Sequence, residues 1–141
     1  MAMARWLGIY LIAMVLFLAL DGVWLTTMSA RLYAPVLGEL MAPAARLGPA
    51  LLFYLGYLAG LVWFAVRPGL AQGPRAGALN GAIYGACCYL TYDLTNQATL
   101  ARWASHITVL DILWGSFASA TAAGLTSLIA ARQKAVGLRK S

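Results

Sequence analysis

The stretch that decides the fold is Leu11-Ile-Ala-Met-Val-Leu-Phe-Leu-Ala-Leu20, an unbroken apolar run that leads directly into Asp21-Gly-Val-Trp24. The surrounding residues 5–28 supply the roughly 20 apolar residues that a helix needs to cross a bilayer. A carboxylate inside such a helix costs roughly 2.5–3.5 kcal/mol on insertion scales, so it usually marks a functional site. The stretch therefore predicts a transmembrane helix that carries a buried aspartate.

The composition of the whole chain is that of a membrane protein. Of its 141 residues, 62% are hydrophobic and 10% are charged, whereas a soluble domain carries about a quarter charged residues. The formal net charge is +6, but the basic residues lie between apolar runs and form no single patch, so we expect no nucleic-acid partner. The length allows four spans with short loops, in one domain over residues 1–141.

Four apolar runs predict an all-α integral membrane bundle, with transmembrane helices over residues 5–28, 49–67, 75–97 and 106–131. In the first outer loop, Pro35-Val36-Leu37 followed by Leu40-Met41 predicts a short interfacial helix. A cleaved signal peptide is a less favoured interpretation of the first run, because its apolar part exceeds the usual length of about 7–15 residues.

The lysine and arginine residues predict the orientation, because cytoplasmic segments carry an excess of them. If both termini are inside, seven basic residues are cytoplasmic and three are outside. The inner set is Arg5, Arg67, Arg75, Arg132, Lys134, Arg139 and Lys140, and the outer set is Arg31, Arg46 and Arg102. We therefore expect an N-in, C-in topology.

This orientation places three aspartates from three helices at one depth. Asp21, Asp93 and Asp111 each fall one or two helical turns from the outer end of a predicted helix. Loss of hydration and crowding by like charges favour the protonated form of a carboxyl group, so such a cluster supplies proton donors near neutral pH. The three aspartates are the candidate catalytic acid/base cluster.

Several side chains near the cluster are candidates for binding a substrate. Asp111-Ile-Leu-Trp114 repeats the spacing of Asp21-Gly-Val-Trp24, with each Trp one helical turn beyond its Asp. The two tryptophans are equally well explained as members of an interfacial aromatic belt. The candidate binding residues are Trp24, Tyr54, Tyr57, Tyr89, Asn96 and Trp114.

A row of glycines predicts close packing of helices. Gly77, Gly81 and Gly85 repeat every four residues, a spacing that lets helix backbones approach each other. We expect the row to be used inside the bundle, and a homodimer or a larger membrane complex is the alternative. No motif identifies a cofactor or a metal site, since Cys87 and Cys88 are adjacent rather than spaced as ligands.

Three motifs carry a resemblance to a known family. They are Leu20-Asp21-Gly22-Val23-Trp24-Leu25, Tyr92-Asp93-Leu94-Thr95-Asn96-Gln97-Ala98-Thr99-Leu100 and Leu110-Asp111-Ile112-Leu113-Trp114-Gly115. Together they resemble a bacterial family of predicted membrane proteins, catalogued as domain of unknown function 2177, over nearly the whole chain. The resemblance implies a multi-span inner-membrane protein with these Asp, Asn and Trp positions as its signature, and it implies no activity, substrate or cofactor.

Three functions fit the sequence. The first is an enzyme that acts on a lipid, isoprenoid or similar apolar substrate by acid/base chemistry, with Asp93 as the acid or base and a Trp or Tyr face beside a developing cation. The second is a transporter whose carboxylates bind protons or a cation. The third is an accessory subunit of a membrane complex, with the aspartates protonated or paired with Arg31 or Arg102. Membrane lipids are contacted in each case.

Overall fold

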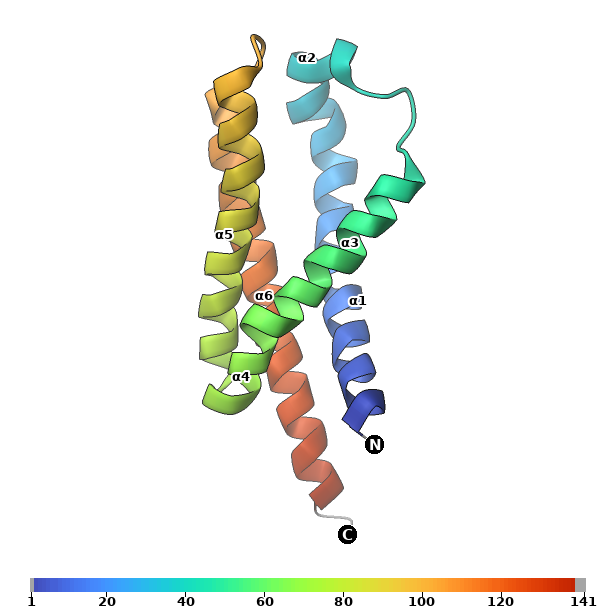
Figure 1. Ribbon diagram of the computed structural model, residues 1–141, viewed down its shortest axis with the longest axis vertical. Helices are drawn as coiled ribbons and strands as arrows, with labels where there is room; N and C mark the ends of the chain where they lie inside the picture. Colours follow the sequence, from blue (N-terminus) through green and yellow to red (C-terminus); the bar gives the residue numbers. More distant parts are fainter. Residues whose placement is uncertain (1, 139–141) are drawn as a thin grey trace.

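The computed structural model describes residues 2–138, and every regular element in that range is helical (Figure 1). This confirms the predicted all-α fold. The elements are α1 (Ala2–Met28), the π-helical turn η1 (Ser29–Tyr33), α2 (Ala34–Leu37), the 3-10 turn η2 (Gly38–Leu40), α3 (Leu47–Leu61), the π-helical turn η3 (Val62–Val66), α4 (Arg67–Gln72), α5 (Pro74–Thr99) and α6 (Ser105–Leu138).

Four long helical segments run up and down through the molecule. The beginning of α1 and the end of α6 lie on the same side of it (Figure 1). Three segments are long and apolar enough to cross a membrane, and they cover Met3–Leu37, Leu47–Gln72 and Ser105–Gln133. The fourth, α5, matches the predicted span at 75–97 in position. It is less apolar because small residues and Asn80, Asp93 and Asn96 interrupt it.

Two helices extend beyond their predicted ends at residues 28 and 67 and continue through Pro35 and Pro68. Helix α1 continues through η1 into α2, and α3 continues through η3 into α4 beyond the predicted boundary at residue 67. Each π-helical turn ends two residues before a proline, and the intervening residue closes it: the N–H of Ala34 bonds to Ser29 O, and the N–H of Arg67 bonds to Val62 O. A proline lacks an N–H and clashes with the carbonyl four residues earlier. The wider turn moves that carbonyl away, so the helix continues.

The glycine row holds α5 against α6. Gly77, Gly81 and Gly85 are buried, and a Cβ atom added to Gly81 would lie 2.5 Å from Ser119 O. One added to Gly85 would collide with Gly115 O. The row is therefore used inside the bundle, as expected. The same alternation pairs residues further up the two helices, where the Tyr89 ring occupies the space that Gly115 leaves.

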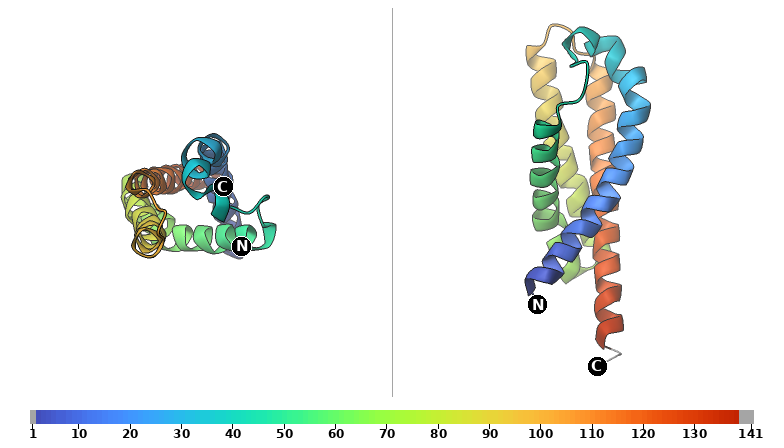
Figure 2. Two further views of the ribbon diagram at one scale, coloured as in Figure 1. Left: turned by 90° about the horizontal axis from the view of Figure 1, so that it is seen from above. Right: turned by 90° about the vertical axis from the view of Figure 1, so that its right-hand side faces the viewer.

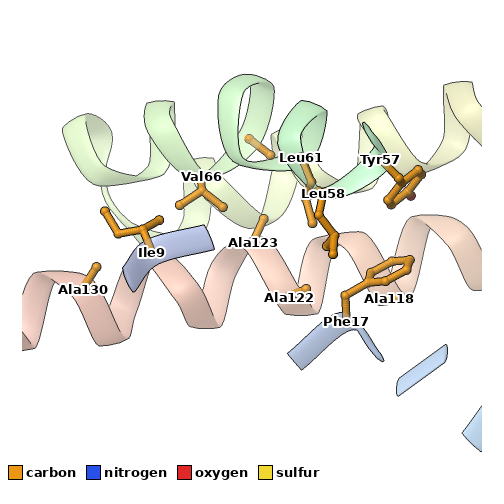
Figure 3. Close-up of a cluster of buried hydrophobic side chains, with 11 residues drawn as sticks. Ile9, Phe17, Tyr57, Leu58, Leu61, Val66, Ala118, Ala122, Ala123 and Ala130 are labelled. Atoms are coloured by element: carbon orange, nitrogen blue, oxygen red, sulfur yellow. The ribbon is translucent and has the colours of Figure 1, made fainter. Parts of the chain in front are cut away.

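The apolar core lies where α3 crosses the other helices (Figure 3). Phe17 of α1, Leu58 and Leu61 of α3 and Ala118 and Ala122 of α6 are fully buried there. Seen from above, the beginning of α3 lies away from α5 and α6 (Figure 2). In Figure 1, α3 leans across the bundle. This tilt leaves space in the upper half of the molecule between α1, α3 and α5.

Candidate functional site

A cavity of about 610 Å³ lies in the upper half of the bundle and is open on one side. Its size is within the range of roughly 300–1,000 Å³ that is usual for ligand pockets. The lining is mainly aromatic and aliphatic, with two carboxyl groups. The described lining residues are Asp21, Trp24, Leu25, Tyr33, Leu37, Met41, Ala50, Phe53, Tyr54, Tyr57, Cys88, Tyr89, Tyr92 and Asp111.

The two Asp-x-x-Trp motifs brace each other across the interface of α1 and α6. The rings of Trp24 and Trp114 stack at 4.5 Å with an angle of 9° between their planes. Trp114 Nε1 points at Asp21 Oδ1 at 3.4 Å, a long hydrogen bond. Trp24 Nε1 donates to Tyr33 Oη at 2.9 Å, and Tyr33 Oη donates to Asp111 Oδ1 at 2.5 Å. Each tryptophan thus supports the aspartate of the other motif.

Tyrosine hydroxyls orient both aspartates of the cavity. Tyr33 supports Asp111, and Tyr54 Oη donates to Asp21 Oδ2 at 2.6 Å. Asp21 and Asp111 are each 4% exposed, so these two donors replace much of the hydration that burial removes. A hydrogen bond from a neutral hydroxyl to a carboxylate is short and strong, and it fixes the carboxylate without neutralising its charge.

Asp93 is not among the described residues that line the cavity. It lies on the face of α5 that packs against α6. Its side chain is fully buried, and neither Oδ1 nor Oδ2 has a hydrogen-bond partner. The carboxyl group of Asp111 lies close enough to interact with it electrostatically. Two ionised carboxylates offer only acceptors, so a hydrogen bond between them requires that one of them carries a proton. We call these two residues the Asp93–Asp111 pair.

The site has a large surplus of hydrogen-bond acceptors. A carboxylate has roughly four acceptor positions, whereas Asp21 receives two donors, Asp111 receives one and Asp93 receives none. No Lys, Arg or His side chain is among the described residues that line the cavity. Within residues 2–138 no group of three or more His, Cys, Asp or Glu side chains is placed to hold a metal ion.

The structure brings most of the predicted site residues together. The cavity is lined by Trp24, Tyr54, Tyr57 and Tyr89. Trp114 is not among the described lining residues, but it contacts two of them, Trp24 and Asp21. The hydroxyl of Tyr57 shares a hydrogen bond of 2.6 Å with Ser119 Oγ, deeper in the core. Asn96 is not among the lining residues. The described hydrogen-bond donors to Asp21 and Asp111 are the side chains of Tyr54, Trp114 and Tyr33.

Tyr33 is the most important residue that the sequence analysis missed. The prediction ended the first helix at residue 28 and placed Tyr33 in a loop, whereas η1 continues the helix and turns Tyr33 toward Asp111. The signal is Pro35, which follows the π-helical turn by two residues and is compatible with a helix that continues. Phe53 and Tyr92, which also line the cavity, stand on helices that were predicted.

The segment after Asp93 fixes the connection between α5 and α6. Gln97 Nε2 donates to Ser105 Oγ at 3.0 Å, and Gln97 Oε1 accepts from Thr108 Oγ1 at 2.7 Å. Thr108 Oγ1 in turn accepts from Trp103 Nε1 at 2.9 Å. This network holds the end of α5 beside the beginning of α6, and so it maintains the distance between Asp93 and Asp111.

Comparisons with known proteins identify a family and no characterised relative. A search of curated proteins and a search of solved structures found no match. The family model described as "Predicted membrane protein (DUF2177)" matches residues 6–128, which include the three aspartates and both tryptophan motifs. The match covers most of the chain and confirms the resemblance drawn from the three motifs. This chain is a member of the predicted membrane protein family DUF2177.

Proposed function

We propose that this protein is an enzyme of the bacterial inner membrane that acts on a lipid-like apolar substrate by acid/base chemistry. The substrate occupies the cavity between α1, α3 and α5, and the Asp93–Asp111 pair exchanges a proton with it. In this proposal the chain crosses the membrane four times with both termini in the cytoplasm, and the cavity lies in the outer half of the bilayer.

The four-span topology is supported by the course of the helices and by the position of the charges. Helix α5 is 26 residues long, which at about 1.5 Å per residue is enough to cross a bilayer. It runs alongside α6 in the opposite direction (Figure 1). A helix with glycine and polar residues can span a membrane when other helices cover its polar face. In α5 the buried residues are Gly77, Gly81, Gly85 and Asp93.

The observation that carries the function is the unpartnered Asp93 beside Asp111 at the wall of an apolar cavity. A buried carboxylate without donors is costly, and a proton shared with a second carboxyl group relieves that cost. Such a pair can donate a proton to a substrate and recover one afterwards, which is general acid/base catalysis. Asp111 faces the cavity and Asp93 does not, so Asp111 is the residue that contacts the substrate and Asp93 is the proton partner.

The lipid-like character of the substrate follows from the walls. The side chains of Leu25, Leu37, Met41, Ala50 and Phe53 surround the space between α1 and α3. The outer face of α3 exposes Leu51, Leu52 and Leu55, as expected of a surface that contacts acyl chains. A substrate dissolved in the membrane can therefore enter from the side, with its apolar part along α3 and its reactive part at Asp111.

Occupancy of the cavity tests the binding part of the proposal. Ala50 lines the cavity, whereas Ala59 is exposed on the same helix outside the lining. Native mass spectrometry of protein released from its own membrane should show a bound lipid for the wild type and for Ala59→Trp, and none for Ala50→Trp. Equal occupancy in the two tryptophan variants would contradict a lipid in this cavity.

A further inference from the structure

The charges and the aromatic rings of the cavity together favour one sign of ligand charge. The formal charge on the described lining comes from Asp21 and Asp111, and no basic side chain opposes it. Asp93 adds a third carboxyl group directly behind Asp111 and lacks any donor. The tyrosine hydroxyls of Tyr33 and Tyr54 orient the carboxylates but carry no charge. The described lining of the cavity therefore has acceptors in excess and includes no basic side chain.

Aromatic faces strengthen this preference. The face of an indole or phenol ring attracts a cation through its quadrupole, by about 0.5–2 kcal/mol per contact. Trp24 lines the cavity together with Asp21 and Asp111, and it is stacked on Trp114, so its ring is held in place. Tyr54, Tyr57 and Tyr89 also line the cavity. Carboxylates framed by aromatic rings are the combination that recognises amines and quaternary ammonium groups.

We propose that the cavity selects apolar molecules that carry a positive charge, with the charge placed between Asp21 and Asp111 against the Trp24 ring. The inference concerns the ligand class of the site described under the proposed function and rests on that site. A positive charge on the bound molecule balances the carboxylates, which no basic side chain of the described lining does. The apolar body of the molecule then extends along the aliphatic wall formed by Leu37, Met41 and Phe53.

Other ligand charges fit the cavity poorly. A phosphate or carboxylate head group is usually bound by Arg or Lys side chains, and none lines the described cavity. A hard metal ion such as Mg²⁺ or Ca²⁺ needs about six or more oxygen ligands, and the described carboxyl groups form no metal-binding cluster. An organic cation needs neither, because its charge is spread over a large apolar surface.

Two ions of the same shape and opposite charge test the inference. Tetraphenylphosphonium and tetraphenylborate are titrated calorimetrically into the purified full-length protein in a non-ionic detergent. The Ala50→Trp variant, which keeps all the carboxyl groups, measures the partition of each ion into the micelle. After this subtraction, tetraphenylphosphonium should bind saturably, and tetraphenylborate should bind at least about tenfold more weakly.

Charge-removing variants connect the selectivity to the site. Asp21→Asn combined with Asp111→Asn should abolish the preference for the cation. Glu39→Gln, which removes the fourth acidic residue of the chain, should keep it. If the double variant does not fold, Trp24→Leu serves in its place and should weaken the binding of the cation but not that of the anion. Equal affinities of the wild type for both ions, or a preference that Glu39→Gln also removes, would overturn the inference.

The outcome separates this inference from the proposed function. If native mass spectrometry finds a lipid that Ala50→Trp excludes, while the two ions bind equally, the lipid site stands and the charge selectivity is wrong. If neither a lipid nor the cation depends on Ala50, the cavity is not a binding site and both proposals are wrong.

Discussion

At the scale of single residues, the site depends on how three buried carboxyl groups obtain hydrogen-bond donors. Tyr33 supplies the donor to Asp111 and is itself supported by Trp24. Tyr54 supplies the donor to Asp21. Asp93 has no donor and adjoins Asp111. The same fold therefore holds two carboxylates in fixed positions and leaves the third dependent on a proton.

Removal of the Tyr33 hydroxyl should destabilise the protein, because Asp111 loses the tyrosine hydroxyl that donates to it. A buried group that loses its partner costs about 1–3 kcal/mol, so the unfolding free energy of Tyr33→Phe in detergent should fall by about this amount. Tyr10→Phe is the matched control, because its hydroxyl makes an exposed bond to Leu55 O at 3.1 Å. A Tyr33→Phe protein as stable as Tyr10→Phe would show that this bond does not support Asp111.

Asp93→Asn should leave the protein folded and at least as stable as the wild type. The amide is nearly isosteric with the carboxyl group, and its NH₂ group donates to Asp111 in place of the shared proton. Asp93→Leu removes every polar atom and should lower stability, because Asp111 then faces an apolar side chain. Thermal melting of both variants in the same detergent checks the order. A melting temperature for Asp93→Asn below that of Asp93→Leu would contradict it.

At the scale of elements, two rows of small residues set the register of α5 against α6. The row on α5 consists of Gly77, Gly81 and Gly85, at intervals of four residues. On the antiparallel helix α6 these glycines face Ser127, Ser119 and Gly115, respectively. The next steps bring Tyr89 to Gly115 and Asp93 to Asp111. The packing that joins the two helices is thus also the packing that places the Asp93–Asp111 pair.

A large side chain in the glycine row should separate the helices. Gly81→Leu forces its side chain into the Ser119 backbone and should cost about 1–3 kcal/mol or more from overpacking. Leu79→Ile changes an exposed residue two positions earlier, on another face of the helix, and should be almost neutral. The comparison is made by thermal unfolding in detergent. Equal melting temperatures would mean that the row does not pack against α6.

The elements show how far a sequence alone predicts this site. The helix-forming runs and the glycine row follow from periodicity and composition. The pairing of Asp93 with Asp111 follows once the two rows of small residues are aligned. The continuation of the first helix beyond residue 28 was missed, and so was that of the second helix through Pro68, because a proline usually ends a helix. The π-helical turns that allow both continuations depend on backbone geometry. The hydrogen bond from Tyr33 to Asp111 was missed for the same reason.

At the scale of the whole molecule, the tilt of α3 creates the cavity, and no local pattern in the sequence encodes a tilt. The core around Phe17, Leu58 and Ala118 joins α3 to the bundle at its middle. Toward its beginning α3 diverges from α5 and α6 (Figure 2), and Phe53 and Tyr54 of α3 line the cavity. Asn96 was predicted from its spacing to Asp93 on one helix face, yet it is not among the described lining residues.

The orientation of the molecule should follow its basic residues. Reporter fusions at Ser141 and after Gln72 should indicate the cytoplasm, and a fusion near Gly38 should indicate the outer side. The reason is the excess of Arg and Lys in the segments assigned to the inside. A reporter at Ser141 that is active outside would contradict the topology and would place the cavity in the inner half of the membrane.

The central claim is that the Asp93–Asp111 pair transfers a proton to a lipid-like substrate, and comparison of whole-cell lipids tests it most directly. Cells that lack the protein are complemented with the wild type, Asp93→Asn or Glu39→Gln at equal abundance, and their lipids are compared by mass spectrometry. Asparagine keeps the size of Asp93 and removes its titration. We predict that the wild type and Glu39→Gln restore a lipid species that Asp93→Asn does not restore. Full restoration by Asp93→Asn, or lipids unchanged by loss of the protein, would contradict the account.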